Sequence, residues 1–329
     1  MTFLYIIIGL VLIFDFINGF HDSANSIATI VSTKVLSPFN AVLMAALFNF
    51  IAFTVFPLKV AATMGKGIID PGAVTLTVIA GALVAAITWN LLTWWWGLPS
   101  TSSHTLVGGL VGASIAGSGP GSVISGGVLK IAAFIVIAPL LGMIISFVIS
   151  VIVMNLIRNF SPSVIDKHFK RLQILSAAAF SLGHGGNDAQ KSMGIIWIAL
   201  ITMGLSSIED SRPDFWVIIS CQAAIALGTL FGGWRIVKTM GQKITKLRSF
   251  EGFCAETAGA LTLFGATHFG IPVSTTHTIT GSIIGVGAIK GLSAVKWGVT
   301  GKIFLAWIFT IPVSALIGAL MYYFFEAIF

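Results

Sequence analysis

Apolar stretches alternate with short polar segments along almost the whole chain. Several stretches reach the ~20 residues that an α-helix needs to cross a ~30 Å hydrocarbon core, and the shorter ones are better interpreted as half-helices or hairpin arms. The ~10-residue alternating segments of a membrane β-barrel do not occur. The pattern therefore predicts an all-α polytopic membrane protein with broken helices and hairpins. The apolar stretches are residues 3–17, 39–57, 73–96, 104–117, 131–157, 172–182, 193–205, 215–234, 255–269, 277–289 and 299–325.

Composition supports a membrane protein and excludes a soluble one. Hydrophobic residues make up 56% of the chain and charged residues only 9%, with a mean hydropathy of +1.00, whereas globular domains carry about 25% charged residues. The net charge of +7 could suggest a nucleic-acid partner. The Lys and Arg residues are, however, concentrated in two loops, 158–171 and 235–248, and no polar domain exists to bind nucleic acid. The positive-inside rule instead places both loops in the cytoplasm.

Two polar sequence motifs each occur twice, in the same order, within this apolar pattern. We call the first the aspartate phrase and the second the hydroxyl phrase. GFHDSANS at residues 19–26 corresponds to GGNDAQKS at 185–192, so that glycine, aspartate and serine coincide. GLPSTSSHT at 97–105 corresponds to GIPVSTTHT at 270–278. Polar groups are costly at membrane depth, and interrupted segments at matching positions of two halves are the best sequence indication of a transporter's binding site. We therefore predict a duplicated solute carrier.

The duplication also predicts the domain organisation. Residues 1–157 form a first membrane repeat, 158–171 a cytoplasmic linker loop, and 172–329 a second membrane repeat. Each half contains an odd number of crossings, so the halves run in opposite directions through the membrane as an inverted-topology repeat. With the basic loops inside, both termini lie outside a plasma membrane that the chain crosses several times.

The aspartate phrases are candidate cation sites. Asp22 and Asp188 have glycines nearby, which permit a helix to unwind and free its carbonyl oxygens. A carboxylate beside amide and hydroxyl oxygens, such as those of Asn25 and its neighbours, suits a hard cation or a proton. We therefore expect Asp22, Asn25 and Asp188 to couple transport to H⁺ or Na⁺. The alternative is that each aspartate only caps a helix or joins two helices.

The hydroxyl phrases are candidate anion sites. Pro99 and Pro272 each precede clustered Ser and Thr, which predicts a helix break followed by a new helix N-terminus. Unpaired N–H groups and the positive end of the helix dipole bind anions there, and the hydroxyls add donors. Two such ends facing each other would hold a small tetrahedral oxyanion, whereas simple capping and helix packing is the alternative. The candidate hydroxyls are those of Ser100, Thr101, Ser102 and Ser103 after Pro99, and of Ser274, Thr275 and Thr276 after Pro272.

Basic and imidazole groups in the same phrases are candidates for a charge or proton relay. His21, His104 and His277 could relay protons near physiological pH, although a lone buried histidine is equally often a packing residue. Lys191 occupies the position that corresponds to Asn25. An ammonium group cannot coordinate Na⁺ but can take its place, which argues against a symmetric pair of sodium sites and favours proton coupling or a reduced sodium count.

The paired phrases, taken together, resemble the signatures of the inorganic phosphate transporter (PiT) family over essentially the whole chain. The resemblance implies a secondary transporter that imports inorganic phosphate by symport with H⁺ or Na⁺, without a resident cofactor, as a homodimer in the lipid bilayer. A divalent metal–phosphate complex is an alternative form of the substrate. The family includes sodium-coupled, proton-coupled and sulfate-carrying proteins, so a sulfate symporter is the alternative function. The family's binding positions carry over to Asp22, Asn25, Asp188, Gln190, Ser102, Ser103, Thr275 and Thr276.

Two rival functions are less compatible with the sequence. An enzyme would need a catalytic motif, but neither a G-x-S-x-G elbow nor an HExxH zinc motif occurs. Ser103 and His104 are adjacent on one predicted helix and therefore point about 100° apart, which is poor geometry for base activation. A passive anion channel would need the hydroxyls but not Asp22 and Asp188. We therefore expect a carrier and not an enzyme.

Cysteine labelling from each side of the membrane can check the predicted topology. In a background without Cys221 and Cys254, a cysteine introduced at Thr2 should react with an impermeant maleimide from outside. Cysteines at Ile165 and Lys243 should react only after permeabilisation, because the basic loops lie inside. Labelling of positions 2 and 165 from the same side would contradict the inverted repeat.

Overall fold

Helices account for nearly all of the described fold. The computed structural model describes residues 1–207 and 209–328, which form twelve α-helices and four short 3₁₀ turns. The first half contains α1 (Thr2–Ser32), α2 (Pro38–Ile51), η1 (Ala52–Thr54), α3 (Lys59–Lys66), η2 (Pro71–Ala73), α4 (Leu76–Trp96), α5 (Ser102–Ser118), η3 (Pro120–Ser122) and α6 (Ser125–Ile157). The second half contains α7 (Pro162–Thr202), α8 (Phe215–Phe231), α9 (Trp234–Gln242), α10 (Ser249–His268), α11 (Thr275–Ile289), η4 (Leu292–Ala294) and α12 (Trp297–Glu326).

The two halves repeat one order of elements. Each begins with a long helix, α1 or α7, followed by two helices with a sharp bend between them. The bend is 82° between α2–η1 and α3 and 72° between α8 and α9. Each half then forms a helical hairpin and ends in a long helix with an internal proline, Pro139 in α6 and Pro312 in α12. The sequence duplication therefore extends to the three-dimensional structure.

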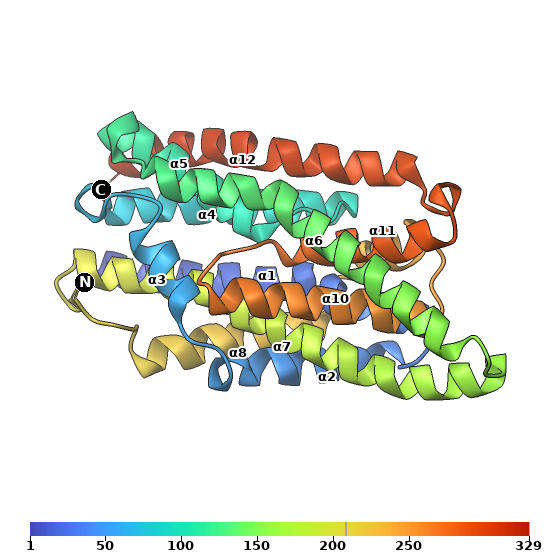
Figure 1. Cartoon of the computed structure of the whole chain (residues 1–329). Helices are drawn as coiled ribbons and strands as arrows, with labels where there is room; N and C mark the ends of the chain where they lie inside the picture. The colour runs from blue at the N-terminus through green and yellow to red at the C-terminus, as the bar shows by residue number, and fades with distance from the viewer. Residues whose placement is uncertain (208, 329) are drawn as a thin grey trace.

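The helices α1 and α7 cross the middle of the molecule in opposite directions. Ser192 donates to Asp15 at 2.6 Å, and Thr33 donates to Gln173 at 2.9 Å. Early residues of α1 thus contact late residues of α7, and late residues of α1 contact early ones, which is an antiparallel arrangement. In Figure 1 the two chain termini lie at one end and the α6–α7 connection lies at the other.

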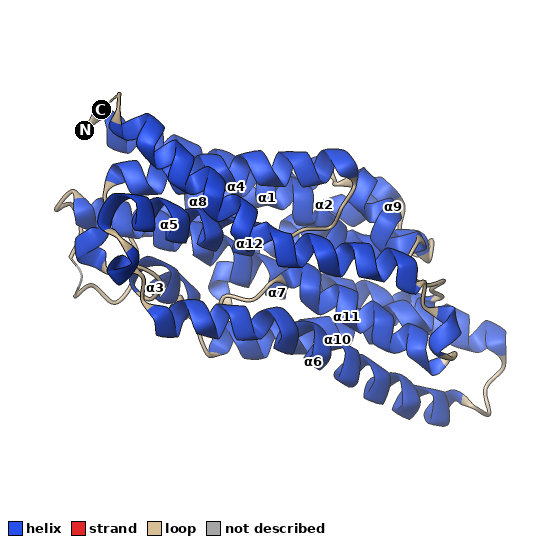
Figure 2. Ribbon diagram, turned by 90° about the horizontal axis from the view of Figure 1, so that it is seen from above, coloured by secondary structure: helices blue, strands red, loops and turns tan. Residues whose placement is uncertain are grey.

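The hairpins α4–α5 and α10–α11 enter from opposite ends and their tips meet near the middle (Figures 1 and 2). Both tips turn at a glycine in the left-handed region, Gly97 with φ 65° and Gly270 with φ 68°, where a side chain would be strained. Leu98 N donates to Thr93 O and Ile271 N donates to Ala266 O, so both turns use the same closing hydrogen bond. Equivalent sequences have therefore produced equivalent turns.

The second arm of each hairpin packs on the last helix of the other half. The helix α5 lies against α12, and α11 lies against α6 (Figure 1). Glycines make this approach close, because a Cβ atom on Gly112 would lie 1.9 Å from Ala315 O, and one on Gly285 would lie 2.2 Å from Met143 O. Small residues that bring backbones together are the usual means of helix association in membranes.

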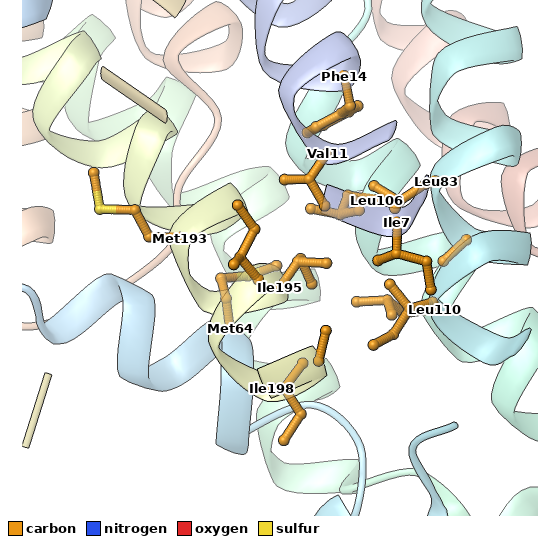
Figure 3. Packing of buried hydrophobic residues seen from close by; sticks show 14 of the residues in the cluster. Ile7, Val11, Phe14, Met64, Leu83, Leu106, Leu110, Met193, Ile195 and Ile198 are labelled. Carbon is orange, nitrogen blue, oxygen red and sulfur yellow. The ribbon is translucent and has the colours of Figure 1, made fainter. Parts of the chain in front are cut away.

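Apolar side chains fill the space between α1 and the first hairpin. Figure 3 shows Ile7, Val11 and Phe14 of α1 close to Leu83 of α4 and to Leu106 and Leu110 of α5, and all six are buried. Ile195 and Ile198 of α7 and Met64 of α3 belong to the same cluster. A second buried cluster surrounds α10 and α11 in the same way. The two hairpins are therefore each fixed by an apolar core of their own.

The outer helices have the surface of a membrane protein. Among the described residues four helices, α1, α4, α6 and α12, are long and apolar enough to span a membrane, and the two bent pairs raise the number to six if each is one span. Large apolar side chains on α6 and α12 are exposed, including Ile144 at 55% and Ile308 at 63%. Such faces are stable against lipid and not against water. The chain is thus a multi-pass membrane protein.

The linker loop predicted for residues 158–171 is wrong in extent. The loop ends at Ser161, and α7 begins at Pro162. Proline is favoured in the first turn of a helix, and Lys170 pairs with Asp166 one turn away at 2.7 Å. The hydrogen bond from Lys170 holds the pKa of Asp166 below its ordinary value, with a smaller contribution from Ser249. Hydropathy misses this segment because it is a polar helix that extends beyond the apolar region.

The unwinding predicted around Asp22 and Asp188 is also wrong. Both aspartates lie inside continuous helices. The neighbouring glycines serve close packing instead, since a Cβ atom on Gly19 would lie 2.1 Å from Ile225 O and one on Gly185 would lie 2.4 Å from Asn49 O. The backbone carbonyls near the aspartates therefore remain in helical hydrogen bonds, and side chains must supply the polar groups of the site.

Substitution of Gly112 can test the contact between α5 and α12. The Gly112→Ala variant should melt at a lower temperature in detergent than the parent protein, because overpacking costs about 1–3 kcal/mol. The Gly9→Ala variant is the matched control, since a Cβ atom there meets nothing within 4 Å. Equal melting temperatures of the two variants would contradict the close approach.

Candidate functional site

Three titratable side chains meet where α1 and α7 cross. Potential ligand atoms of Asp22, His184 and Asp188 all lie within 4.8 Å of one another. The three side chains are buried, with at most 2% of any residue exposed. Two carboxylates and an imidazole at this depth are a group that could hold a cation or a proton, because buried like charges need a positive charge between them.

The hydrogen-bonding partners of Asp22 come from its own half of the chain. His21 Nδ1 lies 2.6 Å from Asp22 Oδ1. Ser102 Oγ, in the first turn of α5, lies 3.2 Å from Asp22 Oδ2 and 2.6 Å from Asn18 Oδ1. A hydroxyl has one hydrogen to donate, so Ser102 can serve only one of these acceptors at a time. The first hairpin tip is thereby tied to α1.

The surroundings of Asp188 repeat this arrangement with one addition. Thr275 Oγ1, in the first turn of α11, donates to Asp188 Oδ2 at 3.3 Å, as Ser102 does to Asp22. Lys191 Nζ pairs with Asp188 Oδ1 at 2.5 Å. The ammonium group also donates to Ser103 Oγ at 2.5 Å and to Val273 O at 2.8 Å. A carboxylate, a hydroxyl and a carbonyl oxygen therefore converge on one buried positive charge.

In each half, one side chain links the long helix to the hairpin of the other half. Asn25 of α1 donates to Thr275 Oγ1 at 3.1 Å and to Thr276 Oγ1 at 3.0 Å. Lys191, which occupies the corresponding position of α7, donates to Ser103. The amide and the ammonium thus perform the same structural task in the two halves. They differ in that Lys191 brings a full charge.

His184 shows where a positive charge would fit between the carboxylates. Its Nδ1 lies 3.1 Å from Asn49 Oδ1, and Asn49 Nδ2 donates to Thr229. The amide oxygen thus faces the ring, so we assign the neutral tautomer with the proton on Nδ1, which satisfies both groups. His184 Nε2 lies 3.3 Å from Asp188 Oδ2 without hydrogen-bond geometry to a described residue. In the neutral ring two acceptors face each other there, and a proton or a cation would relieve the contact.

The hairpin tips offer two helix N-termini, as the hydroxyl phrases predicted. The helix α5 begins at Ser102 and α11 begins at Thr275. Ser274 caps α11 by accepting from His277 N, whereas no side chain in the described part of the chain caps the N-terminus of α5. The N–H groups of the first turn of α5 are therefore the more available donors for an anion.

The two hairpin histidines lie together but away from the carboxylates. The rings of His104 and His277 are 4.8 Å apart, and His277 is 3.7 Å from the ring of Trp307. Trp307 Nε1 donates to Pro99 O, which fixes the indole under the first hairpin tip. No direct contact between either histidine and Asp22 or Asp188 occurs among the described residues. A relay from the carboxylates to this pair would therefore need an intermediate group.

Gln190 lies outside the group of predicted site residues. Its Oε1 accepts from Val60 N at 3.0 Å and from Ala61 N at 3.3 Å, and its Nε2 donates to Pro57 O at 3.1 Å. The side chain therefore satisfies the backbone at the bend before α3. The residues that the structure does bring together are His21, Asp22, Asn25, Ser102, Ser103, Asp188, Lys191, Thr275 and Thr276, all buried.

Three further polar residues of the site are not among the predicted site residues. His184 precedes Asp188 by one helical turn, a spacing that could have indicated it. Asn18 stands one turn before Asp22 and accepts from Ser102. Asn187 donates to Ile271 O and accepts from Val273 N, which fixes the second hairpin tip. The position of the hairpins, which the sequence does not give, decides the contacts of Asn18 and Asn187.

Comparisons with known proteins show which family and which relatives the chain is similar to. The model of a family described as the phosphate transporter family matches residues 18–318. A probable low-affinity inorganic phosphate transporter of Rhizobium meliloti is 59% identical over 96% of this chain and 95% of its own, and one of Bacillus subtilis is 44% identical over 100% and 98%. A solved structure titled "The sodium-dependent phosphate transporter" is 27% identical, with a TM-score of 0.90 over the whole of both chains.

Removal of Lys191 should destabilise the protein. The Lys191→Met variant leaves Asp188 as a buried charge without its ammonium partner, a change that costs about 3–5 kcal/mol. Its melting temperature in detergent should fall, and the Lys191→Met/Asp188→Asn double variant should recover part of the loss. The control is Lys170→Met, because the ion pair with Asp166 is half exposed and is worth at most ~1 kcal/mol. Equal effects of Lys191→Met and Lys170→Met would contradict the buried pair.

Proposed function

This chain belongs to the phosphate transporter family, and from that premise we propose that it imports inorganic phosphate by symport with H⁺. It is a phosphate transporter and not an enzyme. The finer proposal concerns the coupling ion and the residues that bind it. It is supported chiefly by the oxygens that converge on Lys191 Nζ, from Asp188, Ser103 and Val273.

Those oxygens are of the kinds that coordinate hard cations. Lys191 Nζ lies 2.5 Å from the carboxylate, 2.5 Å from the hydroxyl and 2.8 Å from the carbonyl. A sodium ion and an ammonium cannot occupy this point together. We therefore infer that this half of the protein carries its positive charge permanently in Lys191 and needs no sodium ion there.

The proton is assigned to the group formed by Asp22, His184 and Asp188. A proton between His184 Nε2 and Asp188 Oδ2 would turn two facing acceptors into a hydrogen bond. Asp22 is within 4.8 Å of both groups, so a proton can be shared without a large movement. Sodium at Asp22, Asn25 and Asp188 is the alternative, since the solved relative is titled a sodium-dependent transporter.

Phosphate is assigned to the space between the hairpin tips. Ser102, Ser103, Thr275 and Thr276 lie at the starts of α5 and α11 and supply hydroxyl donors. The uncapped N-terminus of α5 adds backbone donors, and Lys191 adds a positive charge next to Ser103. Near pH 7 each form of phosphate has at least one O–H, which Asp22 or Asp188 can accept, whereas sulfate offers acceptors only.

Transport requires the hairpins to release their contacts in turn. In this structure the site residues are at most 3% exposed, so the site is closed towards both ends. Phosphate competes for the hydroxyls that now bond to Asp22, Asp188, Asn25 and Lys191. We propose that binding loosens one hairpin at a time and that the halves form an inverted-topology repeat in a homodimer, with both termini outside the plasma membrane.

Alanine variants of the hydroxyls test the assignment of the anion. The double variants Ser102→Ala/Ser103→Ala and Thr275→Ala/Thr276→Ala should each raise the half-saturating phosphate concentration for uptake about ten- to a hundredfold, because a hydrogen bond to a charged group is worth ~1.5–3 kcal/mol. Excess sulfate should displace labelled phosphate from the parent protein far less well than unlabelled phosphate does.

The matched control is Ser146→Ala/Ser150→Ala, which removes two buried hydroxyls of α6 that donate to backbone carbonyls. Its half-saturating concentration should stay close to that of the parent. If both hairpin double variants behave like this control, the hydroxyls cap helices and do not bind phosphate. If sulfate competes as well as phosphate, the protein is a sulfate carrier of the same family.

A further inference from the structure

A pocket lined by cationic side chains lies at the end of the molecule opposite the two termini. It has a volume of about 420 Å³ and is formed by the connection from α9 to α10 and the connection from α11 to α12. The starts of α10 and α12 lie at that end in Figure 1, away from the labelled termini. The cations that line it are Lys246, Arg248, Lys290 and Lys296.

Most of this charge is not neutralised by the protein. Lys290 pairs with Glu251 at 2.5 Å and also donates to Lys246 O at 2.9 Å. Within the described chain the side chains of Lys246, Arg248 and Lys296 make no ion pair or hydrogen bond. Three exposed positive charges therefore surround the pocket without a partner.

Two of these cations lie at helix N-termini, where a positive charge is unfavourable. Arg248 is the N-cap of α10 and Lys296 is the N-cap of α12. The N-terminus of a helix carries the positive end of its dipole, so a cation there is repelled and an anion is attracted. Ser, Thr, Asp and Asn are the usual caps. The start of α12 thus adds to the positive potential in the pocket, whereas at the start of α10 the carboxylate of Glu251, which accepts from Arg248 N, offsets the helix dipole.

The fold does not require these charges, as the corresponding junction of the first half shows. Lys296 N donates to Ile244 O at 2.9 Å, and the equivalent Ile124 N donates to Ile68 O at 2.9 Å. The backbone pairing is therefore the same. Yet Asp70 is the single charged residue in segments 67–75 and 117–124, whereas all the charged residues of 243–248 and 290–296 are Lys or Arg.

The positive-inside rule explains the sign of these loops but not their convergence on one pocket. A topological signal needs cations near the membrane, and it does not need residues 246, 248 and 296 to line the same cavity. The neighbouring Trp297 is 51% exposed and Leu292 is 68% exposed. An exposed tryptophan beside lysine is typical of the boundary between lipid tails and headgroups, so the pocket lies at headgroup level.

We propose that this pocket is a second anion site, separate from the transport site, that binds a phosphate group at the membrane surface. The phosphate group belongs either to an anionic lipid headgroup, whose acyl chains would lie along Leu292 and Trp297, or to free inorganic phosphate. Its oxygens would accept from Lys246, Arg248 and Lys296. The occupant would join the base of the second hairpin, at the start of α10, to the start of α12.

The test compares two triple variants with the same change of charge. The pocket variant is Lys246→Gln/Arg248→Gln/Lys296→Gln. The control is Arg158→Gln/Lys167→Gln/Arg171→Gln, which removes three exposed cations from the same end of the molecule but outside this pocket. Equal melting temperatures of the purified proteins establish that both are folded.

Two probes are then measured on each protein in a neutral detergent. Native mass spectrometry counts retained dioleoyl phosphatidylglycerol against dioleoyl phosphatidylcholine, and equilibrium dialysis counts bound labelled inorganic phosphate. For a lipid site, phosphatidylglycerol binding should weaken at least about tenfold in the pocket variant alone, since each basic residue contributes ~1 kcal/mol. For a free-phosphate site, the pocket variant should bind one phosphate fewer than the control.

Either loss, confined to the pocket variant, supports the proposal and identifies the source of the phosphate group. Equal binding of both probes by the pocket variant and the control overturns it, as does an equal loss in both. Phosphate held at the hairpin tips is common to all three proteins, so a failure of the transport assignment would not imitate any of these outcomes.

Discussion

The buried ion pair of Asp188 and Lys191 constrains the centre of this protein. Both residues are at most 2% exposed, and their atoms are 2.5 Å apart. Two charges at membrane depth are stable only when they are paired and when their remaining hydrogen-bonding capacity is used. Ser103 and Val273 meet this need for Lys191, and Thr275 does so for Asp188. Both hairpin tips are therefore held in place by the need to satisfy one charge pair on α7.

The halves share their architecture but differ in charge at two places. At the crossing of α1 and α7, Asn25 and Lys191 occupy corresponding positions and link to opposite hairpins, one as an amide and the other as an ammonium. At the membrane surface, the junction near Lys296 is cationic and its counterpart near Ile124 is not. Duplication fixes the backbone in both cases, so the differences in side-chain charge indicate where the two halves have separate tasks.

Much of the fold could be predicted from residue patterns with a direct local cause. The all-helical class and the starts of α5 and α11 at Ser102 and Thr275 are confirmed, because proline followed by Ser and Thr stops one helix and starts another. The phosphate transporter family and the absence of enzymatic function are likewise confirmed by the comparisons. The inverted orientation and the dimer remain predictions.

The incorrect structural predictions concern residue types that can serve two structural roles. Glycines near Asp22 and Asp188 permit either unwinding or close packing, and contacts with Ile225 and Asn49 decide for packing. Polar residues 162–171 resemble a loop in hydropathy but continue α7 as a helix. The substrate-binding role of Gln190 stays a prediction; its side chain bonds to the backbone at the bend before α3, a position that depends on how distant helices pack. Local sequence cannot distinguish these cases. For the glycines and for Gln190, the residues that decide lie more than a hundred residues away along the chain. For residues 162–171, the packing of a whole helix decides.

The central claim is that Lys191 takes the place of a coupling cation, and its most direct test is uptake of labelled phosphate into proteoliposomes under separately imposed ion gradients. The parent protein should accumulate phosphate when a proton gradient is imposed and should not respond to a sodium gradient alone. The Lys191→Asn variant, which restores the residue type found at Asn25, should gain a response to sodium. Accumulation by the parent protein under a sodium gradient alone, with no response to a proton gradient, would contradict the account.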